Sequence, residues 1–430
     1  MDKENNQAET QPFEEQSMGY WERVLSFSRN AKLFLLGHSL SQITLGVSST
    51  IMNVYLLKMG FDMVFIGNYM AVGTFAAAAS AIPIGVMSDR FGRKRSVLWA
   101  IALTTISAIC EVAFTIPALL LFFSFTKGIG STFKSVVQNP FLMENSTPRE
   151  RIHLFSVNQA IQTVASMIGS ALAGILPLVA AYFANQYGWL DYVEADQLRF
   201  ALGASIVFMA MSFIPMFMIK EAPNASYSKH SVVSDLTSII KDVNIRNLTI
   251  YRFLIGMGAG LTLPFFNVYM SEELNATSEQ ISIVTLGSRV ILTFGTLLSP
   301  YLVRALGRIK SIIVTQLLSI PALLAIAWTK NLTAVTVIYW FRNSMMNMSS
   351  PISTTLGMEI VPADKRATSS STMNMADSLA RSVAQLAGGQ IMQNWGNNVP
   401  YFFTCAIYLV ATIFYWQAFK QYDKKEVSAA

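Results

Sequence analysis

The amino-acid sequence predicts an all-α membrane protein in which twelve transmembrane helices form two pseudo-symmetric six-helix bundles. Two observations lead to this fold class: an apolar composition organised in long runs, and a repeat of about half the chain. Hydrophobic residues make up 53% of the 430 residues and charged residues only 13%, with a mean hydropathy of +0.43. A soluble protein of this length needs a larger charged surface, so the composition indicates a chain that resides in a bilayer.

Twelve apolar runs are long enough to cross about 30 Å of hydrocarbon as helices. The first run is too long for the apolar core of a cleavable signal peptide, so we expect none. The two cysteines, Cys110 and Cys405, fall in spans of different halves, and no disulfide framework is expected. The expected spans are 31–57, 64–87, 96–116, 118–144, 153–182, 198–219, 247–270, 279–302, 309–329, 332–360, 367–394 and 399–420.

Lysine and arginine are distributed unevenly between the loops. Only Lys58, Arg199 and Lys330 fall in loops that follow odd-numbered spans, and those loops carry acidic residues instead. Because basic residues collect in the cytoplasmic loops of membrane proteins, we expect both termini in the cytoplasm of a multi-pass plasma-membrane protein. The net charge of +6 then reports topology, and we expect no nucleic-acid partner.

The second half of the chain repeats the first at an offset of 215 residues, or 214 locally. Aligned positions fall at matching ends of matching spans, which predicts two bundles related by an axis along the membrane normal. The pairs include Asn53 and Asn267, Gly92 and Gly307, Arg93 and Arg308, Lys127 and Arg342, Glu144 and Glu359, and Gly174 and Gly389. The expected organisation is a cytoplasmic segment 1–30, bundles 31–219 and 247–420, a cytoplasmic linker 220–246 and a tail 421–430.

A short basic loop lies between the second and third spans. Its sequence, Gly-x-x-x-Asp-Arg-x-Gly-Arg-Lys-Arg from position 85 to 95, places four cations where they cannot enter hydrocarbon. This pattern resembles the loop 2–3 signature of the major facilitator superfamily of secondary transporters. The resemblance implies alternating access around a cavity lined by spans 1, 4, 7 and 10. It also implies a latch that holds helix ends together in one conformation, formed by Gly85, Asp89, Arg90, Gly92 and Arg93; the two glycines would let helices approach closely.

Ionisable residues inside the spans are the best candidates for function, because they are expensive in hydrocarbon and should face a cavity or a partner. The cations outnumber the acids, so we expect a positive cavity. The cations are Lys127, Lys134, Arg252, Arg289, Arg342 and Arg381, and the acids are Asp377 and Glu111.

The repeat-related pair Lys127 and Arg342 leads to a hypothesis about the substrate. Both lie near the bilayer midplane, and two cations facing one another across a cavity would repel unless an anion lay between them. We therefore expect them to bind a carboxylate or phosphate, with Arg289 as a third contact. In the alternatives, Lys127 holds helices together or gates proton release, or it serves only packing. Further polar candidates for the substrate site are Gln42, Asn53, Lys134 and Asn347.

Proton coupling has three candidate residues in the spans. Asp377 and Arg381 are one helical turn apart, either as a simple neutralising pair or as a protonation site whose discharge releases the arginine. Glu111 is the third candidate, and His38 is a rival. Because Glu111 and His38 each lie near the end of a span, we expect both to be solvated interfacial groups.

The sequence therefore predicts a secondary transporter, not an enzyme, that moves a small organic anion with or against protons. The alternative is a proton-coupled multidrug or metabolite efflux antiporter in which Asp377 or Glu111 attracts the drug. A membrane receptor on a transporter scaffold is a further alternative. No phosphate-binding glycine loop or metal-ligand spacing is present in the sequence. We expect no cofactor, a bilayer as the partner and a monomer.

Overall fold

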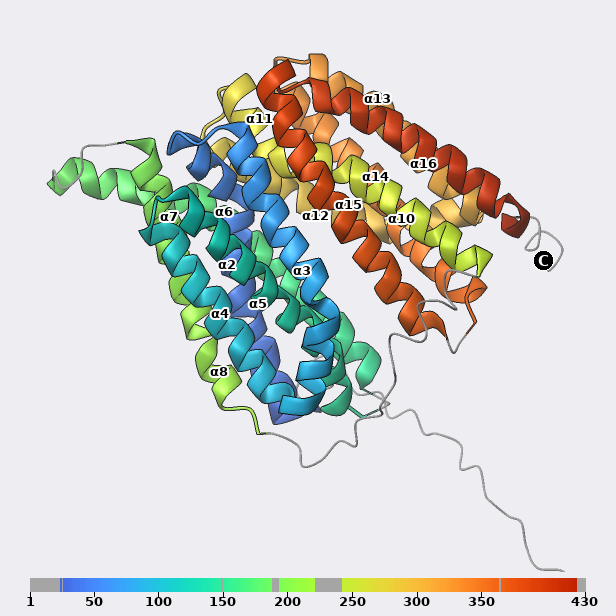
Figure 1. Ribbon diagram of the computed structural model, residues 1–430, viewed down its shortest axis with the longest axis horizontal. Helices are drawn as coiled ribbons and strands as arrows, with labels where there is room; N and C mark the ends of the chain where they lie inside the picture. The colour runs from blue at the N-terminus through green and yellow to red at the C-terminus, as the bar shows by residue number, and fades with distance from the viewer. Residues whose placement is uncertain are drawn as a thin grey trace, which may run out of the picture.

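The computed structural model describes residues 24, 26–147, 150–187, 193–220, 242–362 and 365–423, without the side chains of 89, 152, 367 and 368. The expectations for most of segment 1–30, for residues 221–241 of the linker and for the tail from 424 lie outside these residues. The described part of the chain is helical throughout (Figure 1). Its elements are α2 (Arg29–Lys58), α3 (Met63–Phe91), α4 (Arg93–Ala113), α5 (Pro117–Glu144), α6 (Arg151–Tyr187), α7 (Glu194–Met211), α8 (Phe213–Phe217), α10 (Val243–Thr262), η1 (Leu263–Phe265), α11 (Phe266–Glu273), α12 (Ser278–Leu306), α13 (Arg308–Trp328), α14 (Leu332–Ile360), α15 (Arg366–Trp395) and α16 (Val399–Asp423).

These elements form the twelve predicted spans, because α7 and α8 make one span and α10, η1 and α11 make another. The observed ends differ from the predicted ends by about one helical turn, as expected for boundaries read from sequence. In the described residues, nine spans are long and apolar enough to cross a membrane by composition. The other three are α5, α14 and α15, and these helices carry five of the eight ionisable residues discussed above.

Local geometry at the helix ends repeats between the two halves. Asp62 caps α3 and Thr277 caps α12, each by accepting a backbone N–H of the first turn. Gly92 and Gly307 precede α4 and α13 with φ of 89° and 82°, a backbone conformation that glycine adopts readily. All these equivalent positions are 215 residues apart, so the repeat predicted from the sequence is confirmed.

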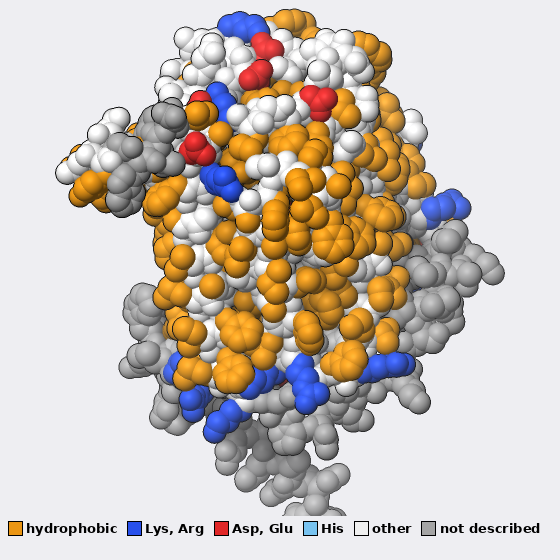
Figure 2. Space-filling model, turned by 60° about the vertical axis from the view of Figure 1, so that its left-hand side comes forward, with side chains coloured by type: hydrophobic (Ala, Val, Ile, Leu, Met, Phe, Trp, Pro, Cys, Tyr) orange, Lys and Arg blue, Asp and Glu red, His pale blue; other side chains and the backbone are white. Residues whose placement is uncertain are grey.

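The molecule has two chemically different ends. We call the end that carries Arg90, Arg93, Lys94 and Arg95 the basic end, and the opposite end, where Lys58 pairs with Glu194, the acidic end. Figure 2 shows a broad belt of hydrophobic side chains, with lysines and arginines along one border and acidic residues gathered at the other. Such a belt is the surface that a bilayer covers.

The two bundles meet at the acidic end and separate toward the basic end (Figure 1). One apolar core runs through both bundles near the acidic end, where Ile51 and Tyr55 share a cluster with Phe265 and Tyr269. Near the basic end the core divides into two separate clusters, one in each bundle. The structure is therefore closed at the acidic end.

Small residues make the close contacts between the bundles. A Cβ on Gly389 of α15 would overlap the carbonyl oxygen of Met63 and lie 3.2 Å from Gly67 Cα on α3. The repeat-related contact joins α6 to α12, where a Cβ on Gly174 would lie 2.9 Å from Ser282 Cβ. Both crossings join one bundle to the other, so these glycines allow the acidic end to close.

Two repeat-related asparagines bond across the same closed end. Asn53 Nδ2 donates to the carbonyl of Pro264 at 2.7 Å, and Asn267 Nδ2 donates to the carbonyl of Thr50 at 2.8 Å. The acceptor in the second bundle lies in η1, where Pro264 interrupts the helical hydrogen bonds and leaves carbonyls available. Each bundle thus donates a hydrogen bond from a side-chain amide to the backbone of the other bundle.

Replacing both asparagines with alanine is expected to open the acidic end more often. Each hydrogen bond contributes about 0.5–1.5 kcal/mol, so losing both should raise the open-to-closed ratio roughly 5- to 150-fold. Spin labels on Glu194 and Lys330, one in each bundle at this end, would report the change as a longer distance distribution. An unchanged distribution in the double variant would contradict a role for these bonds in closure.

Candidate functional site

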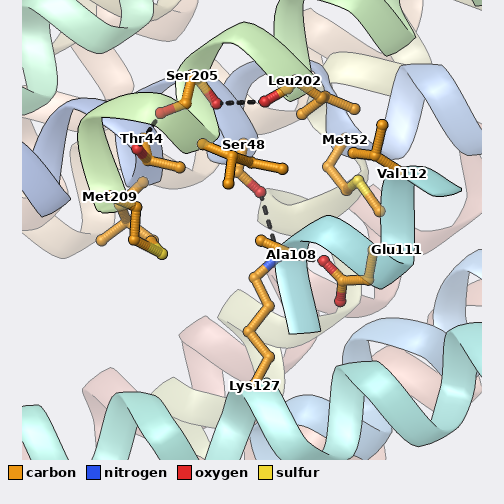
Figure 3. A pocket seen from close by; sticks show the side chains of 12 residues that line it. Thr44, Ser48, Met52, Ala108, Glu111, Val112, Lys127, Leu202, Ser205 and Met209 are labelled. Atoms are coloured by element: carbon orange, nitrogen blue, oxygen red, sulfur yellow. Dashed lines mark hydrogen bonds and ion pairs between the residues drawn. The ribbon is translucent and has the colours of Figure 1, made fainter. Parts of the chain in front are cut away.

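A buried ion pair lies inside the first bundle (Figure 3). Lys127 Nζ on α5 lies 2.6 Å from Glu111 Oε2 on α4 and 3.5 Å from Ser48 Oγ on α2. Tyr69 of α3 donates its hydroxyl to Glu111 Oε1 at 2.7 Å. Glu111 is only 1% exposed, so the expectation that it is a solvated interfacial group was wrong. Lys127, Glu111 and Ser48 border a cavity of about 30 Å³ between α2, α4, α5 and α7.

A second, smaller cavity of about 10 Å³ lies inside the other bundle. Its cation is Arg342 of α14, which is fully buried. Arg342 Nη2 donates to the hydroxyl of Tyr408 at 3.1 Å, and the guanidinium lies 5.7 Å from the centre of that ring. Its Nε and Nη1 have no hydrogen-bond partner in the described part of the chain. The lining residues are Thr262, Leu263, Phe266, Leu323, Ile326, Tyr339, Arg342 and Tyr401.

The two cavities are copies of one another under the internal repeat. The equivalent lining residues are Ser48 and Thr262, Met52 and Phe266, Ala108 and Leu323, Glu111 and Ile326, and Lys127 and Arg342. One difference changes the electrostatics, since the carboxylate of Glu111 is replaced by the apolar side chain of Ile326. In the first cavity the charges of Lys127 and Glu111 cancel, whereas the second holds a cation without an acidic partner among the described residues.

The repeat-related cations Lys127 and Arg342 do not face one another, contrary to the prediction from the sequence. Lys127 and Arg342 each point into a cavity of their own bundle, and they do not face one another across a shared space. An anion held between them is therefore not supported by this conformation. The long lysine side chain extends from α5 to Glu111 on α4. Neutralisation by that acid explains why Lys127 is tolerated in the bundle.

Arg289 occupies the boundary between the bundles. It belongs to α12 in the second bundle, and its Nη2 donates to Ser49 Oγ of α2 in the first bundle at 3.2 Å. Its Nε is buried without a hydrogen-bond partner, and it makes no ion pair within the residues described. Arg289 and Arg342 both act electrostatically on Tyr339, so the two arginines lie near the same ring.

A ladder of polar side chains joins α2 to α6. The two helices cross where Gly46 meets Ser166 and Gly169, and backbone atoms make the contact there. One turn further toward the basic end, Gln42 Nε2 contacts Gln162 Oε1 at 3.3 Å and His38 Nε2 at 2.9 Å. His38 is 2% exposed, which overturns the expectation that it is solvated. The close helix crossing positions this amide pair.

Lys134 lies beside the same ladder. Its Nζ donates to Ser41 Oγ at 2.5 Å, and it lies near enough to His38 for direct electrostatic interaction. Lys134 makes no ion pair within the described part of the chain. A polar group with several donors is therefore available on this side of the first bundle.

Asp377 and Arg381 form an ion pair on α15. Arg381 Nε lies 2.7 Å from Asp377 Oδ2 and Nη2 lies 3.3 Å from Oδ1, a two-point contact. Gly256 and Gly260 of α10 pack directly against the backbone of these two residues. The pair therefore lies at a tight helix crossing, where neutralisation of both charges serves packing.

The remaining candidates have local partners. Asn347 Nδ2 bonds to the carbonyl and side chain of Asn343 on its own helix. In the basic loop, Arg93 Nε lies 3.1 Å from Glu144 Oε1, and the repeat-related Arg308 pairs with Glu359. Arg90 is exposed.

The two loop glycines differ in what they do. Gly92 supplies the positive φ that begins α4, whereas a Cβ on Gly85 would come no nearer than 4.0 Å to Val136. The helices do not approach closely at Gly85 in this conformation, and the Asp89 side chain lies outside the described atoms, so the latch stays a prediction.

Comparisons with known proteins agree with this architecture. The model of the Major Facilitator Superfamily matches residues 34–245 and 248–429, one match for each bundle. The chain belongs to the Major Facilitator Superfamily. As a member it is a membrane transporter of small solutes and not an enzyme.

Solved MFS transporters share the fold at low identity. A bacterial homolog of the human lysosomal transporter Spinster, in an inward-facing and occupied conformation, is 14% identical with a TM-score of 0.75 over 94% of this chain and 98% of that one. The nucleoside transporter NupG is 14% identical with a TM-score of 0.74, covering 91% and 99%. A D-xylose–proton symporter is 17% identical with a TM-score of 0.69, covering 93% and 98%.

One curated relative is similar over part of the chain. The proton myo-inositol cotransporter of Homo sapiens is 26% identical over 148 residues, which is 34% of this chain and 21% of that protein. The match therefore spans about a fifth of the relative. The chain is similar to these MFS proteins, whose names refer to nucleosides, D-xylose and myo-inositol.

Sequence reasoning did not find the partners of the two buried cations. Tyr408, which accepts a bond from Arg342, and Tyr69, which donates to the Glu111 partner of Lys127, are ordinary membrane-helix residues by pattern. Only the three-dimensional packing brings them to these sites. One usable signal was present: the repeat places Ile326 opposite Glu111. In an MFS fold this alignment shows that the second bundle has an apolar residue at the position where the first bundle has a carboxylate.

Proposed function

We propose that this MFS transporter moves a small organic anion by alternating access and couples the movement to protons. Arg289 is the observation on which the anionic substrate rests. It lies between the bundles, bonds to Ser49 of the other bundle and keeps Nε free of a partner in the described structure. A guanidinium in that place offers a carboxylate or phosphate a charge-assisted contact that both bundles can sense.

The orientation is part of this proposal. Basic residues collect in cytoplasmic loops, so the basic end would face the cytoplasm of the plasma membrane. The conformation closed at the acidic end is then the inward-facing one. The basic loop of Arg90 and Arg93 would act as the latch in the opposite, outward-facing conformation.

The Glu111–Lys127 pair is the favoured proton site. Protonating the carboxylate would remove the charge that neutralises Lys127 and leave a buried cation without its partner. That change favours a rearrangement of α4 and α5, which is a route from proton binding to helix movement. Asp377 is a weaker candidate because Arg381 contacts both of its oxygens and helix packing surrounds the pair.

Replacing Arg289 with glutamine is expected to weaken binding of the transported anion. A charge-assisted hydrogen bond contributes about 1.5–3 kcal/mol, so KM should rise roughly 10-fold or more, and Arg289→Lys should keep part of the affinity. Uptake into proteoliposomes measures the change. Arg252→Gln removes the same charge at α10, where the side chain bonds to Thr354, and should leave KM unaltered. Equal effects in both glutamine variants would contradict the proposal.

A neutral hydroxylated solute is a second candidate. The ladder of Gln42, Gln162 and His38 offers amide and imidazole groups of the kind that bind hydroxyls, and the relatives named above include a myo-inositol and a xylose transporter. A cationic drug is less well supported, because Glu111 and Asp377 already have cationic partners. Uptake of polyols with no effect of Arg289→Gln would favour the neutral solute.

A further inference from the structure

The cavity of the second bundle has an unusual combination of charge, size and hydrogen-bond donors. Three of the residues that line it carry four donor groups without partners within the described chain: Nε and Nη1 of Arg342 and the hydroxyls of Thr262 and Tyr401. The exposed fractions of these three residues are 0%, 1% and 1%. Buried donors without partners are costly, and here three residues of one small cavity carry them.

The charge in this cavity requires a counter-charge. A guanidinium remains protonated in proteins, and moving an unpaired ion into a low-dielectric interior costs several kcal/mol or more. In the first bundle Glu111 supplies the counter-charge for Lys127. In the second bundle the equivalent residue is Ile326, and Tyr408 offers Arg342 only a neutral hydroxyl and a ring face.

We propose that the Arg342 cavity binds a chloride-sized inorganic anion, which takes the place that the Glu111 carboxylate has in the first bundle. The cavity volume of about 10 Å³ is at the lower limit for one water molecule, so a chloride requires the lining side chains to move slightly apart. A bulkier anion would require the helices to separate. A monatomic anion accepts bonds from all directions, so it can satisfy the arginine and both hydroxyls together. This inference concerns the second bundle alone and does not depend on which solute is transported.

The test is thermal unfolding of the full-length purified protein in gluconate buffer, titrated with chloride or bromide at constant ionic strength. We expect a saturable rise in melting temperature with each halide and none with added gluconate. Tyr401→Phe and Thr262→Val each remove one hydroxyl and little volume, so both should fold and lower the halide affinity about tenfold. No halide effect on the wild type would overturn the proposal.

The internal repeat supplies the decisive variant. Ile326→Glu places a carboxylate opposite Arg342, as Glu111 stands opposite Lys127, and should make the melting temperature independent of halide. Ile326→Gln has a similar size without the charge and should remain halide-dependent. If Ile326→Glu responds to chloride as strongly as the wild type does, the bound halide is not the partner of Arg342.

The same anion chemistry could come from the carboxylate of a transported solute, and competition distinguishes the two sources. A resident halide should bind independently of organic carboxylates added at increasing concentration. Displacement of bromide by such a carboxylate, followed by the bromide anomalous signal in crystals, would assign the cavity to the solute and overturn the resident halide. Failure of solute transport in Arg289→Gln alone would leave the halide result unchanged, so the two proposals can fail separately.

Discussion

Glu111→Gln is expected to abolish proton-driven accumulation of the solute while leaving exchange of solute for solute measurable. The carboxylate is 1% exposed and lies 2.6 Å from Lys127 Nζ, so glutamine leaves a partly buried ammonium without its counter-charge. Breaking a buried ion pair costs about 3–5 kcal/mol, and partial exposure of the lysine places the expected loss of unfolding free energy near the lower limit. Proteoliposomes with and without an imposed proton gradient separate accumulation from exchange.

A double variant distinguishes loss of the proton site from loss of the fold. Glu111→Gln combined with Lys127→Met removes both charges, so it should recover most of the thermal stability and still lack proton-driven accumulation. Asp377→Asn is the matched carboxylate control and should keep an unchanged dependence on the proton gradient. Normal proton-driven accumulation by Glu111→Gln would contradict a proton site at Glu111. Loss of accumulation in Asp377→Asn alone would indicate that the proton site is Asp377 on α15.

Gly389→Val should arrest the transport cycle by preventing closure of the acidic end. A Cβ at this position would overlap a backbone oxygen of α3 in the other bundle, so the two helices would have to separate. Overpacking of this kind costs about 1–3 kcal/mol, which changes a two-state ratio roughly 5- to 150-fold. Spin labels on Glu194 and Lys330 should therefore report a population that is mostly open at the acidic end, with transport reduced in proportion.

The neighbouring glycine is a control for this prediction. A Cβ on Gly388 would lie 2.9 Å from the carbonyl oxygen of Leu261 and 3.0 Å from the ring of Phe265, both in its own bundle. Gly388→Val should therefore lower thermal stability without a preference for one conformation. If the two variants gave the same stability and the same label distances, the crossing of α3 and α15 would have no special role in closure.

The fold followed from the sequence because its causes are local or periodic. Long apolar runs set the spans, and Gly92 and Gly307 marked equivalent helix starts that the structure bears out. The repeat also placed Asn53 opposite Asn267 before their bonds were known. Prolines in the spans were expected to bend helices, and Pro264 goes further, because it lies in η1, which divides one predicted span into two helices.

The candidate site followed only in part, since side-chain direction depends on how helices tilt and cross. Lys127 and Arg342 were identified by charge and repeat, but their helical faces did not reveal that each points into its own bundle. Glu111 lies near the end of α4 in sequence and was expected to be solvated. Packing of α3, α4 and α5 buries it instead, and the length of the lysine side chain joins two residues that differ in depth. Neither effect can be read from spacing along one helix.

We propose above that the transported solute is an organic anion bound at Arg289 and driven by protons. The most direct measurement is transport current in proteoliposomes on a solid-supported membrane, with carboxylates, phosphates, polyols, nucleosides and cationic drugs applied at pH 6 and pH 8 to wild type and Arg289→Gln. We expect currents with one class of anion, larger under an inward proton gradient and strongly reduced in the variant. Currents with polyols, nucleosides or cationic drugs only, equal in both proteins, would contradict the account.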